Sequence, residues 1–301
     1  MQLTKLTKRQ VSSKRRSILV TGVPRSGTTW LARLLSCAPH TALAGREPMN
    51  PRGNQFALGH TLSGWARVTT FTPQQQRTLR LAYRGLIPEA YSRYGHRQWA
   101  APLPTTRLVV KDPFAMLSLP AVVQVTAARP ILVYRHPGVV LSSYRRMGWT
   151  PDLGEIAPLV AVDSAGPEDG PLPGCEAAAE MARFWVALNG AALADLRAIP
   201  DAVIVSHEDL ALGGNNALAR LFDLCDLPWN AAVERAIERA GSASAAPAES
   251  PPAKALHDFS RSPAQVAGAW RAKVSPEELQ TLEHIAGGLL SDLEAARANL
   301  T

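Results

Sequence analysis

Residues Ser17 to Ser36 read "SILVTGVPRSGTTWLARLLS", and the predicted fold is built around them. An apolar run leads into a loop with glycines at positions 22 and 27, and apolar residues then recur at helical spacing. This order predicts a β-strand, a tight loop and an α-helix. Backbone N–H groups of such a loop and the N-terminus of the following helix point at one place, so we expect an anion to bind there.

The loop differs from one that binds a nucleoside triphosphate. The triphosphate loop reads G-x-x-x-x-G-K-[ST], and here Thr28 stands at the position of the lysine. A cation lies inside the loop instead, at Arg25, whose guanidinium can bind two oxygens at once. Together with the hydroxyls of Ser26, Thr28 and Thr29, this set of donors suits a 5′-phosphate or phosphosulfate group.

Length and charge predict one folded domain with a basic tail. The 301 residues, of which 46% are hydrophobic, suffice for a single large core. The net charge is +7, and the basic residues of positions 1–16 supply +6 of it, so the rest of the chain is nearly neutral; they are Lys5, Lys8, Arg9, Lys14, Arg15 and Arg16. We therefore expect residues 1–16 to be a disordered tail, residues 17–301 to be the domain, and nucleic acid not to be a partner.

Targeting and redox features are sparse. The apolar run after the tail is too short for a secretory signal, and no stretch approaches the ~20 apolar residues of a spanning helix. We expect a soluble, cytoplasmic protein without a transmembrane segment. Cys37, Cys175 and Cys225 are far apart and lack metal-ligand spacing, which favours free buried thiols.

The rest of the pattern predicts an α/β domain with a central parallel sheet flanked by helices. Apolar runs without alternation, in "TALAG", "RLVVKDPF", "PILVYRHPG" and "AVIVSHEDL", are typical of strands covered on both faces. Helices are expected from the loop to about residue 38, around 117–126, from residue 137, over 175–198 and after the S-x-x-E capping box at 275–278. A polar region over 74–94 is expected to be mostly helical, 150–174 to be a surface loop or lid, and 241–263 to be mobile.

The loop also carries a family resemblance. "PRSGTTW", Pro24 to Trp30, resembles the P-[KR]-S-G-T-T loop of the sulfotransferases that use 3′-phosphoadenosine 5′-phosphosulfate. The resemblance implies a P-loop-like fold and assigns the 5′-phosphosulfate to residues 25–30: Arg25, Ser26, Gly27, Thr28, Thr29 and Trp30. "VYRHPGVVLSSYRR" is similar to the family's 3′-phosphate motif, in which an Arg at a strand end precedes a Ser by eight residues, as Arg135 precedes Ser143.

The resemblance also bears on the catalytic base. "VVKDPF" resembles the K-D-P-F segment of protein-tyrosine sulfotransferases, with Lys111 as the lysine, and Pro113 stands where small-molecule sulfotransferases have their histidine base. "AGREP" resembles the Gly-Glu segment that carries the catalytic glutamate, so it implies Glu47 as the base. Asp112 remains a rival, and a structural pairing of Glu47 with Arg46 or Arg52 is the alternative. His60 and His96 are expected to be loop histidines.

Two weaker similarities complete the comparison. "VSHEDL" is similar to the Y-E-D-L strand end, with His207 in place of the tyrosine. The C-terminal segment resembles the R-x-G…G-x-W-[KR] loop that covers the cofactor, with Arg261, Trp270 and Arg271 in the matching places, although its early glycine is missing. Residues 50–105 match none of these motifs, and the resembled family recognises its acceptor substrate in that region.

The resemblance implies in-line transfer of a sulfuryl group to a hydroxyl or amine of a carbohydrate, lipid or small metabolite, releasing adenosine 3′,5′-bisphosphate. Arg25 and Lys111 would stabilise the growing charge, Glu47 would take the proton, and no metal is required. Two alternatives stay open. One is a magnesium-dependent P-loop kinase, favoured by the glycine spacing and Asp112, and the other is a non-catalytic nucleotide-binding module.

Overall fold

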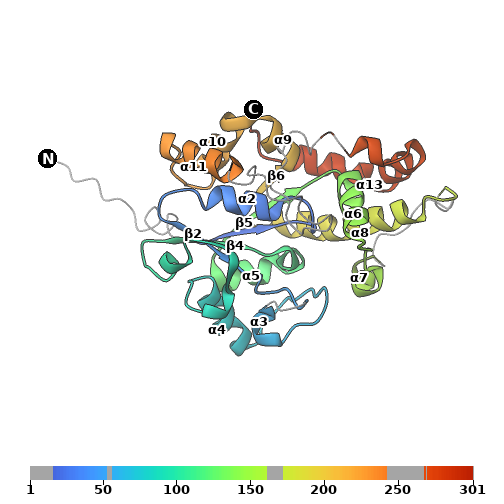
Figure 1. Cartoon of the computed structure of the whole chain (residues 1–301). Helices are drawn as coiled ribbons and strands as arrows, with labels where there is room; N and C mark the ends of the chain where they lie inside the picture. The colour runs from blue at the N-terminus through green and yellow to red at the C-terminus, as the bar shows by residue number, and fades with distance from the viewer. Residues whose placement is uncertain (1–15, 53–55, 161–171, 243–267, 269, 301) are drawn as a thin grey trace.

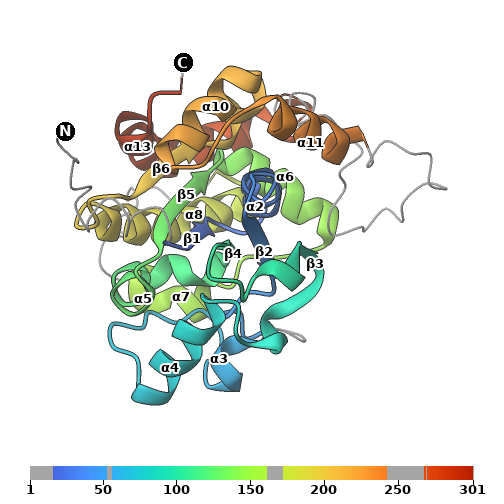
Figure 2. The ribbon, with the colours of Figure 1, turned by 90° about the vertical axis from the view of Figure 1, so that its left-hand side faces the viewer.

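A computed structural model of the chain describes residues 16–52, 56–160, 172–242, 268 and 270–300 (Figure 1). Its centre is a six-stranded sheet in the order β3-β2-β4-β1-β5-β6, which Figure 2 shows from one end to the other. All neighbouring strands are parallel except β2 and β3, which are antiparallel. The strands are β1 (Ile18–Thr21), β2 (Thr41–Gly45), β3 (Tyr91–His96), β4 (Arg107–Lys111), β5 (Arg129–Tyr134) and β6 (Val203–Ser206).

Helices cover both faces of the sheet, with α10 and α11 on one side and α4 and α5 on the other (Figures 1 and 2). They are α2 (Thr28–Leu35), α3 (Ala57–His60), α4 (Pro73–Ala82), α5 (Leu119–Thr126), α6 (Pro137–Met147), α7 (Leu153–Val160), α8 (Glu176–Leu196), α9 (His207–Leu212), α10 (Gly214–Leu224), α11 (Ala231–Ser242) and α13 (Pro276–Ala296). Short 3-10 turns are η1 (Pro88–Ala90), η2 (Gln98–Ala100), η3 (Pro113–Leu117) and η4 (Arg271–Lys273).

Strand β1 shows why its sequence is an uninterrupted apolar run. Ile18 and Val20 pack with α2 and α10 on one face, while Leu19 packs with α5 and α8 on the other. All three side chains are fully buried. Because successive residues of a strand point to opposite faces, burial on both faces removes the polar positions of an alternating pattern. The predicted α/β fold with a parallel sheet is confirmed.

The prediction of a mostly helical region over 74–94 is wrong at its C-terminal end. The helix α4 ends at Ala82, because Gly85 takes a left-handed φ of 68° and Pro88 follows. Residues 91–96 instead form β3, which pairs with β2 at the edge of the sheet. Gly45 permits this pairing, because a Cβ there would lie 2.7 Å from the backbone nitrogen of Gly95.

The prediction of a loop over 150–174 is wrong over Leu153–Val160, which form α7. Ile156 of α7 is fully buried in the core that includes α8, and the Asp152 side chain accepts a hydrogen bond of 3.1 Å from the Glu155 backbone N–H. Residues 150–152 and 172–174 of that predicted loop form neither helix nor strand, while residues 161–171 and most of the predicted mobile segment 241–263 lie outside the described residues. The helix expected to reach residue 38 ends at Leu35.

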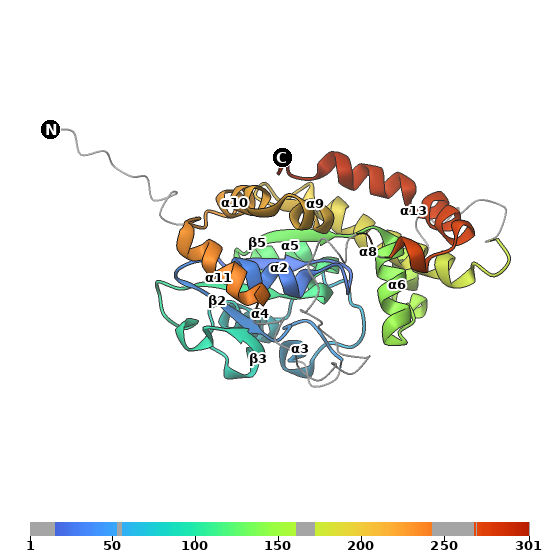
Figure 3. The ribbon, with the colours of Figure 1, turned by 45° about the horizontal axis from the view of Figure 1, so that its top comes forward.

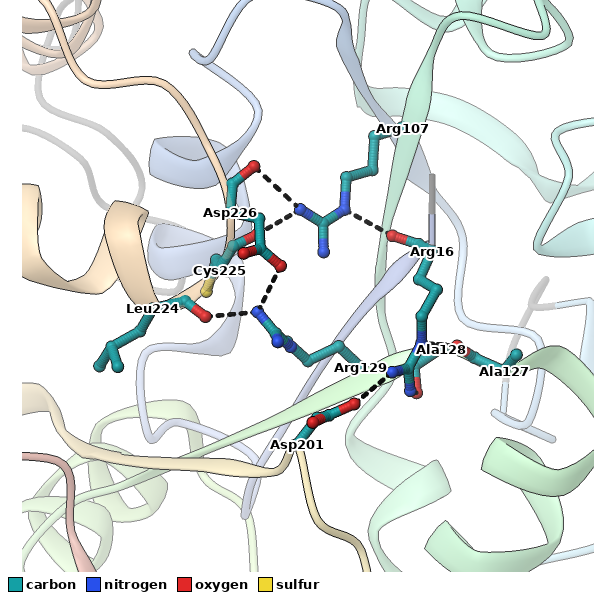
Figure 4. A network of polar contacts seen from close by, with 9 residues as sticks. All are labelled: Arg16, Arg107, Ala127, Ala128, Arg129, Asp201, Leu224, Cys225 and Asp226. Carbon is teal, nitrogen blue, oxygen red and sulfur yellow. Dashed lines mark hydrogen bonds and ion pairs between the residues drawn. The ribbon is translucent and has the colours of Figure 1, made fainter. Parts of the chain in front are cut away.

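Arginines tie the amino ends of the strands together (Figure 4). Arg107, at the start of β4, donates hydrogen bonds to the backbone carbonyls of Arg16 and Cys225. Arg16, which the sequence placed in the tail, pairs with Asp201, and Arg129 pairs with Asp226. The rest of the tail, residues 1–15, lies outside the described residues. The three cysteines are free and buried, as predicted, and no helix among the described residues has the length and apolar character needed to cross a membrane.

Candidate active site

The predicted site residues gather at the carboxyl edge of the parallel strands. Strand β1 lies between β4 and β5, so the chain leaves β1 in the direction of β2 and later returns to β5 on its other side. Such a switch point, outside the carboxyl ends of the strands, is where open α/β sheets bind ligands. The strand ends bring together Arg25 after β1, Glu47 after β2, Lys111 at the end of β4, Arg135 after β5 and His207 after β6.

The loop between β1 and α2 has the backbone of an anion-binding turn. Arg25 and Gly27 take left-handed φ values of 77° and 93°, and the backbone N–H of Ser26 bonds the carbonyl of Val23 at 2.9 Å. Gly22 is required for packing, because a Cβ there would lie 2.2 Å from the carbonyl oxygen of Val133. The N-terminus of α2 has no side-chain cap, so its first N–H groups, at Thr28 and Thr29, remain available for an anion.

Arg25 links this loop to α6. Its Nε donates a hydrogen bond of 2.9 Å to Oγ of Ser143, and its guanidinium carbon lies 5.9 Å from the ring centroid of Trp149. Burial, followed by the nearby charges of Arg146 and Arg135, lowers the pKa of Arg25 to about 10. The side chain is therefore still a cation at neutral pH, and it joins the two predicted phosphate motifs.

Arg135 lies on the other side of the loop. Its Nη1 donates to the carbonyl of Arg25 at 3.5 Å, and its Nε faces Oε1 of Glu208 at 3.4 Å. Trp185 of α8 fixes the backbone here, because its indole N–H donates to the Arg135 carbonyl at 2.9 Å. Burial lowers the pKa of Arg135, and the carboxylate of Glu208 opposes this shift. Arg135 and Ser143 therefore both contact Arg25, Arg135 at its backbone carbonyl and Ser143 at its guanidinium.

His207 is the first residue of α9 and lies directly beneath the loop. A Cβ added to Gly27 would lie 2.3 Å from Cδ2 of His207, so the glycine is needed at this contact as well as for its φ. The ring centroids of His207 and Trp30 are 4.8 Å apart. Burial, and then the charge of Arg135, lower the pKa of His207 well below its ordinary value, so the ring is neutral at pH 7. The neutral ring of His207 and the ring of Trp30 make an aromatic pair beside the loop between β1 and α2, called the anion loop below.

Trp270 and Arg271 reach the same edge from the C-terminal part of the chain. Trp270 is stacked on His136 at a centroid distance of 4.6 Å and sits over Gly138, where a Cβ would lie 2.3 Å from its ring. Arg271 lies 5.0 Å from the Trp270 ring centroid. Arg145 of α6 pairs with Glu278 in the first turn of α13, which holds this part of the chain against α6 (Figure 3). Arg261 lies outside the described residues.

Glu47 and Lys111 form an ion pair beside the loop. Lys111 lies opposite Val20 in the β1–β4 pairing, one residue from the end of β1. Its Nζ contacts Oε1 of Glu47, and Oε2 of Glu47 accepts a hydrogen bond from the amide of Asn50. Burial lowers the pKa of Lys111 to about 8, with the charge of Asp112 acting in the opposite direction. The expected alternative pairing of Glu47 with Arg52 is absent from the described contacts of Arg52, which pairs with Glu155.

Asp112 has a different environment from Glu47. It is fully buried, Oδ2 accepts the backbone N–H of Met49 at 2.6 Å, and Oδ1 accepts that of Phe114 at 3.1 Å. Burial raises the pKa of Asp112 to about 7. Both of its carboxylate oxygens accept hydrogen bonds from backbone N–H groups, so this side chain joins the end of β4 to the segment that carries Glu47.

Three buried polar atoms around the loop have no hydrogen-bond partner within the described part of the chain. They are Oγ of Ser26, Nη2 of Arg135 and Nδ1 of His207. Each belongs to a side chain of the loop or in contact with it. Leaving a buried polar group unpaired typically costs ~1–3 kcal/mol, which is avoided if a ligand supplies the partner. Within the described ranges, no cluster of three or more His, Cys, Asp or Glu side chains is arranged to hold a metal ion.

Sequence reasoning missed two polar residues of this site. Glu208 pairs with Arg135, and the signal available was its position next to His207 at a strand end. Asn50 contacts Glu47, and the signal was its spacing of three residues in "EPMN". The prediction that His60 and His96 lie in loops is wrong: His60 is the exposed last residue of α3, and His96 is the last residue of β3, with its Nδ1 3.1 Å from the carbonyl of Ser36.

Comparison with solved structures finds similar chains of low sequence identity. The sulfotransferase domain from the curacin biosynthetic pathway is 16% identical, with 92% of this chain and 98% of that domain covered and a TM-score of 0.47. Mouse sulfotransferase SULT7A1 complexed with PAP is 14% identical, with coverage of 93% and 88% and a TM-score of 0.49. Among curated proteins, none matches the sequence significantly. The family model described as the sulfotransferase family matches residues 17–231, and the chain therefore belongs to the sulfotransferase family, whose members are transferases that move sulfuryl groups.

Proposed function

We propose that this enzyme transfers a sulfuryl group from 3′-phosphoadenosine 5′-phosphosulfate to a hydroxyl or amine of a carbohydrate, lipid or small-metabolite acceptor, with Glu47 as the base. The observation that carries the proposal is the set of unpaired buried atoms on Ser26, Arg135 and His207 around a loop of anion-binding geometry. An anionic nucleotide fits this set, because phosphate and sulfate oxygens accept hydrogen bonds from all three side chains.

The residues divide into three groups by what they would hold. The loop N–H groups, with Arg25, Ser26, Thr28 and Thr29, suit the 5′-phosphosulfate. Arg135 and Ser143, which flank Arg25, suit the 3′-phosphate. The rings of Trp30 and His207 suit a purine, and Trp270 with Arg271 would cover the nucleotide from the side of α6. When bound, the phosphosulfate supplies the sulfuryl group.

The proposed chemistry needs positive charge beside the loop and a base for the acceptor. Arg25 and Lys111 supply the charge, and each well-placed donor of this kind is typically worth roughly 3–4 kcal/mol in the transition state. Glu47 orients the acceptor and takes its proton, a contribution of ~10²–10⁴ in rate. Burial supports Glu47 in this role over Asp112, since Asp112 is fully buried with both oxygens bonded to backbone N–H groups, whereas Glu47 keeps an exposed fraction of 7%.

The first test is ligand binding measured by calorimetry. Adenosine 3′,5′-bisphosphate should bind at least tenfold more tightly than adenosine 5′-phosphate, because only the former engages Arg135 and Ser143. Equal affinities would remove the 3′-phosphate assignment. Binding of ATP with magnesium, without binding of the bisphosphate, would favour the kinase alternative.

The second test concerns the base. Glu47→Gln should keep bisphosphate affinity within about twofold and lower sulfuryl transfer by ~10²-fold or more. Transfer is followed with labelled donor over hydroxyl and amine acceptors. A variant with near-normal turnover would exclude Glu47 as the base, and binding without any transfer by the wild-type protein would favour a non-catalytic nucleotide-binding module.

A further inference from the structure

Asn50 closes a tight turn beneath Glu47. The chain runs Glu47-Pro48-Met49-Asn50 after β2, and the backbone N–H of Asn50 donates to the carbonyl of Glu47 at 3.1 Å. Asn50 is buried, with an exposed fraction of 9%, and its amide Nδ2 donates to Oε2 of Glu47. A buried carboxylate needs hydrogen-bond donors, and this amide supplies one to Glu47 from three residues along the same turn.

We propose that Asn50 is a positioning residue for Glu47, a role that rests on the proposed function of Glu47 as the base. The amide holds one carboxylate oxygen of Glu47 from within the same turn. It contacts neither the anion loop nor Arg25 in the described contacts, so its effect on catalysis acts through Glu47.

The orientation of the Asn50 amide is fixed by a second contact. Oδ1 of Asn50 accepts the backbone N–H of Arg52 at 2.8 Å, which identifies the oxygen end of the amide. A flipped amide would lose this bond and place its oxygen against the carboxylate. Asn50 can therefore present only a donor to Glu47.

The turn itself is anchored to β4. The carboxylate of Asp112 accepts the N–H of Met49 at 2.6 Å, which ties the middle of the turn to the end of the neighbouring strand. The backbone position of Asn50 is thus set from one side by Asp112 and its side chain from the other by Arg52. A site residue is held in its productive geometry by packing and hydrogen bonds of this kind.

Asn50 and Lys111 differ in what they can do during catalysis. Lys111 contacts Oε1 of Glu47, but its charge is also needed beside the anion loop, next to the end of β1. The amide of Asn50 is neutral and has no second acceptor assigned to its Nδ2. Each carboxylate oxygen has two lone-pair sites, so Glu47 can take a proton while it keeps the bond to Asn50. Asn50 thus maintains the orientation of Glu47 when Lys111 turns to the ligand.

The experiment compares Asn50→Ala and Asn50→Asp with the wild-type protein. Asn50→Asp preserves the shape of the side chain and replaces the donor by an acceptor. Asn230→Ala is the control, because the side-chain oxygen of Asn230 caps α11 by accepting two backbone N–H groups away from Glu47. The first readout is the pH titration of the Glu47 carboxyl followed by ¹³C NMR, with Glu47→Gln for assignment. Other charged groups at this turn are Arg46 and Arg52 on its own segment, Lys111 at the end of β4 and Asp112 directly after it, which all variants retain.

We expect the titration midpoint of the Glu47 carboxyl to move up by about one pH unit in Asn50→Ala and further in Asn50→Asp, since a lost donor or an added negative charge disfavours the carboxylate. The turnover number should fall about 10- to 100-fold, with the KM for the donor and the affinity for adenosine 3′,5′-bisphosphate unchanged within twofold. Asn230→Ala should change none of these.

An unmoved midpoint in both variants would overturn the proposal, as would normal turnover in Asn50→Asp. If neither variant folds, as judged by circular dichroism, Asn50→Ser retains a short donor and is measured in their place; failure of all three to fold would assign Asn50 to stability instead. A shifted midpoint in a protein whose wild-type form transfers no sulfuryl group would refute the proposed function and leave the contact between Asn50 and Glu47 established.

Discussion

Ser26 has a buried hydroxyl for which the described part of the chain supplies no partner. A hydrogen bond from this hydroxyl to a charged phosphate oxygen is worth about 1.5–3 kcal/mol, and its absence in the free protein costs stability. We therefore expect Ser26→Ala to weaken binding of adenosine 3′,5′-bisphosphate at least tenfold while leaving the melting temperature equal or slightly higher. Calorimetry and thermal unfolding of the free variant measure the two effects.

Ser118→Ala is the matched control for Ser26→Ala. Ser118 is as deeply buried, but its hydroxyl donates to the carbonyl of Ala66 at 3.2 Å and accepts the N–H of Val68 at 2.8 Å. Its removal should lower the melting temperature and leave bisphosphate binding unchanged. A reversed pattern, with Ser26→Ala less stable and binding intact, would show that the hydroxyl of Ser26 serves the fold and not a ligand.

Single residues were predictable where their function depends on neighbours in the sequence. Ser26 and Arg25 stand in a loop whose glycine spacing sets the backbone, so the motif itself indicates an anion site. Glu208 and Asn50 depend on partners from other elements or from a turn, which no local pattern specifies. The roles assigned to Glu47, Lys111 and the other site residues stay predictions until the variants are measured.

Helix α6 depends on His136 at its N-terminus. Nδ1 of His136 accepts the backbone N–H of Gly138 at 3.1 Å, and the ring stacks on Trp270. Burial, and then the charge of Arg271, lower the pKa of His136 from 6.5 to about 4. As pH falls from 6.5 to about 4, the unfolded chain takes up a proton that the folded chain does not, so His136 favours unfolding in this window by up to about 2 kcal/mol at pH 5.

His136→Asn should remove this pH dependence without removing the cap, since asparagine is a good N-cap acceptor and does not titrate. We expect the variant to lose less stability than the wild-type protein between pH 7 and pH 5, measured by denaturant unfolding at each pH. His284→Asn, at an exposed position of α13 away from His136, is measured alongside as the control for the histidine-to-asparagine change. An unchanged slope in His136→Asn would show that the histidine is not held neutral by the fold.

Helices and strands were predictable from the sequence where capping or terminating residues mark their ends. The capping box at Ser275 and Glu278 forms as expected at the start of α13. Strand β3 was missed because its residues mix aromatic and charged side chains at the sheet edge, and its backbone is organised by pairing with β2. Helix α7 was missed because it is a short helix among turn-forming residues, and packing of the buried Ile156 side chain holds it to the core.

The whole molecule separates stability from binding at opposite edges of one sheet. The proposed site uses the carboxyl ends of the parallel strands, and the arginine network uses the amino ends of β4 and β5 (Figure 4). Arg107 is buried, with an exposed fraction of 5%, and its guanidinium satisfies carbonyls before β1 and after α10. Arg107 thereby joins the segment before β1 to the segment after α10, and so contributes to closing the domain.

Arg107→Met should therefore lower stability and leave ligand binding intact. Methionine fills much of the same volume but leaves the carbonyls of Arg16 and Cys225 without this donor, at ~1–3 kcal/mol each, so we expect a loss of about 2–4 kcal/mol in denaturant unfolding. Arg129→Met is the control: its guanidinium bonds the Leu224 carbonyl and Asp226, but both contacts are exposed, and an exposed ion pair is worth about 0–1 kcal/mol. Affinity for adenosine 3′,5′-bisphosphate should stay within twofold in both variants, because neither side chain reaches the carboxyl edge of the sheet. A large loss of affinity in Arg107→Met, measured where the variant is folded, would mean that the two edges are coupled through β4. That strand carries Arg107 at one end and Lys111 at the other.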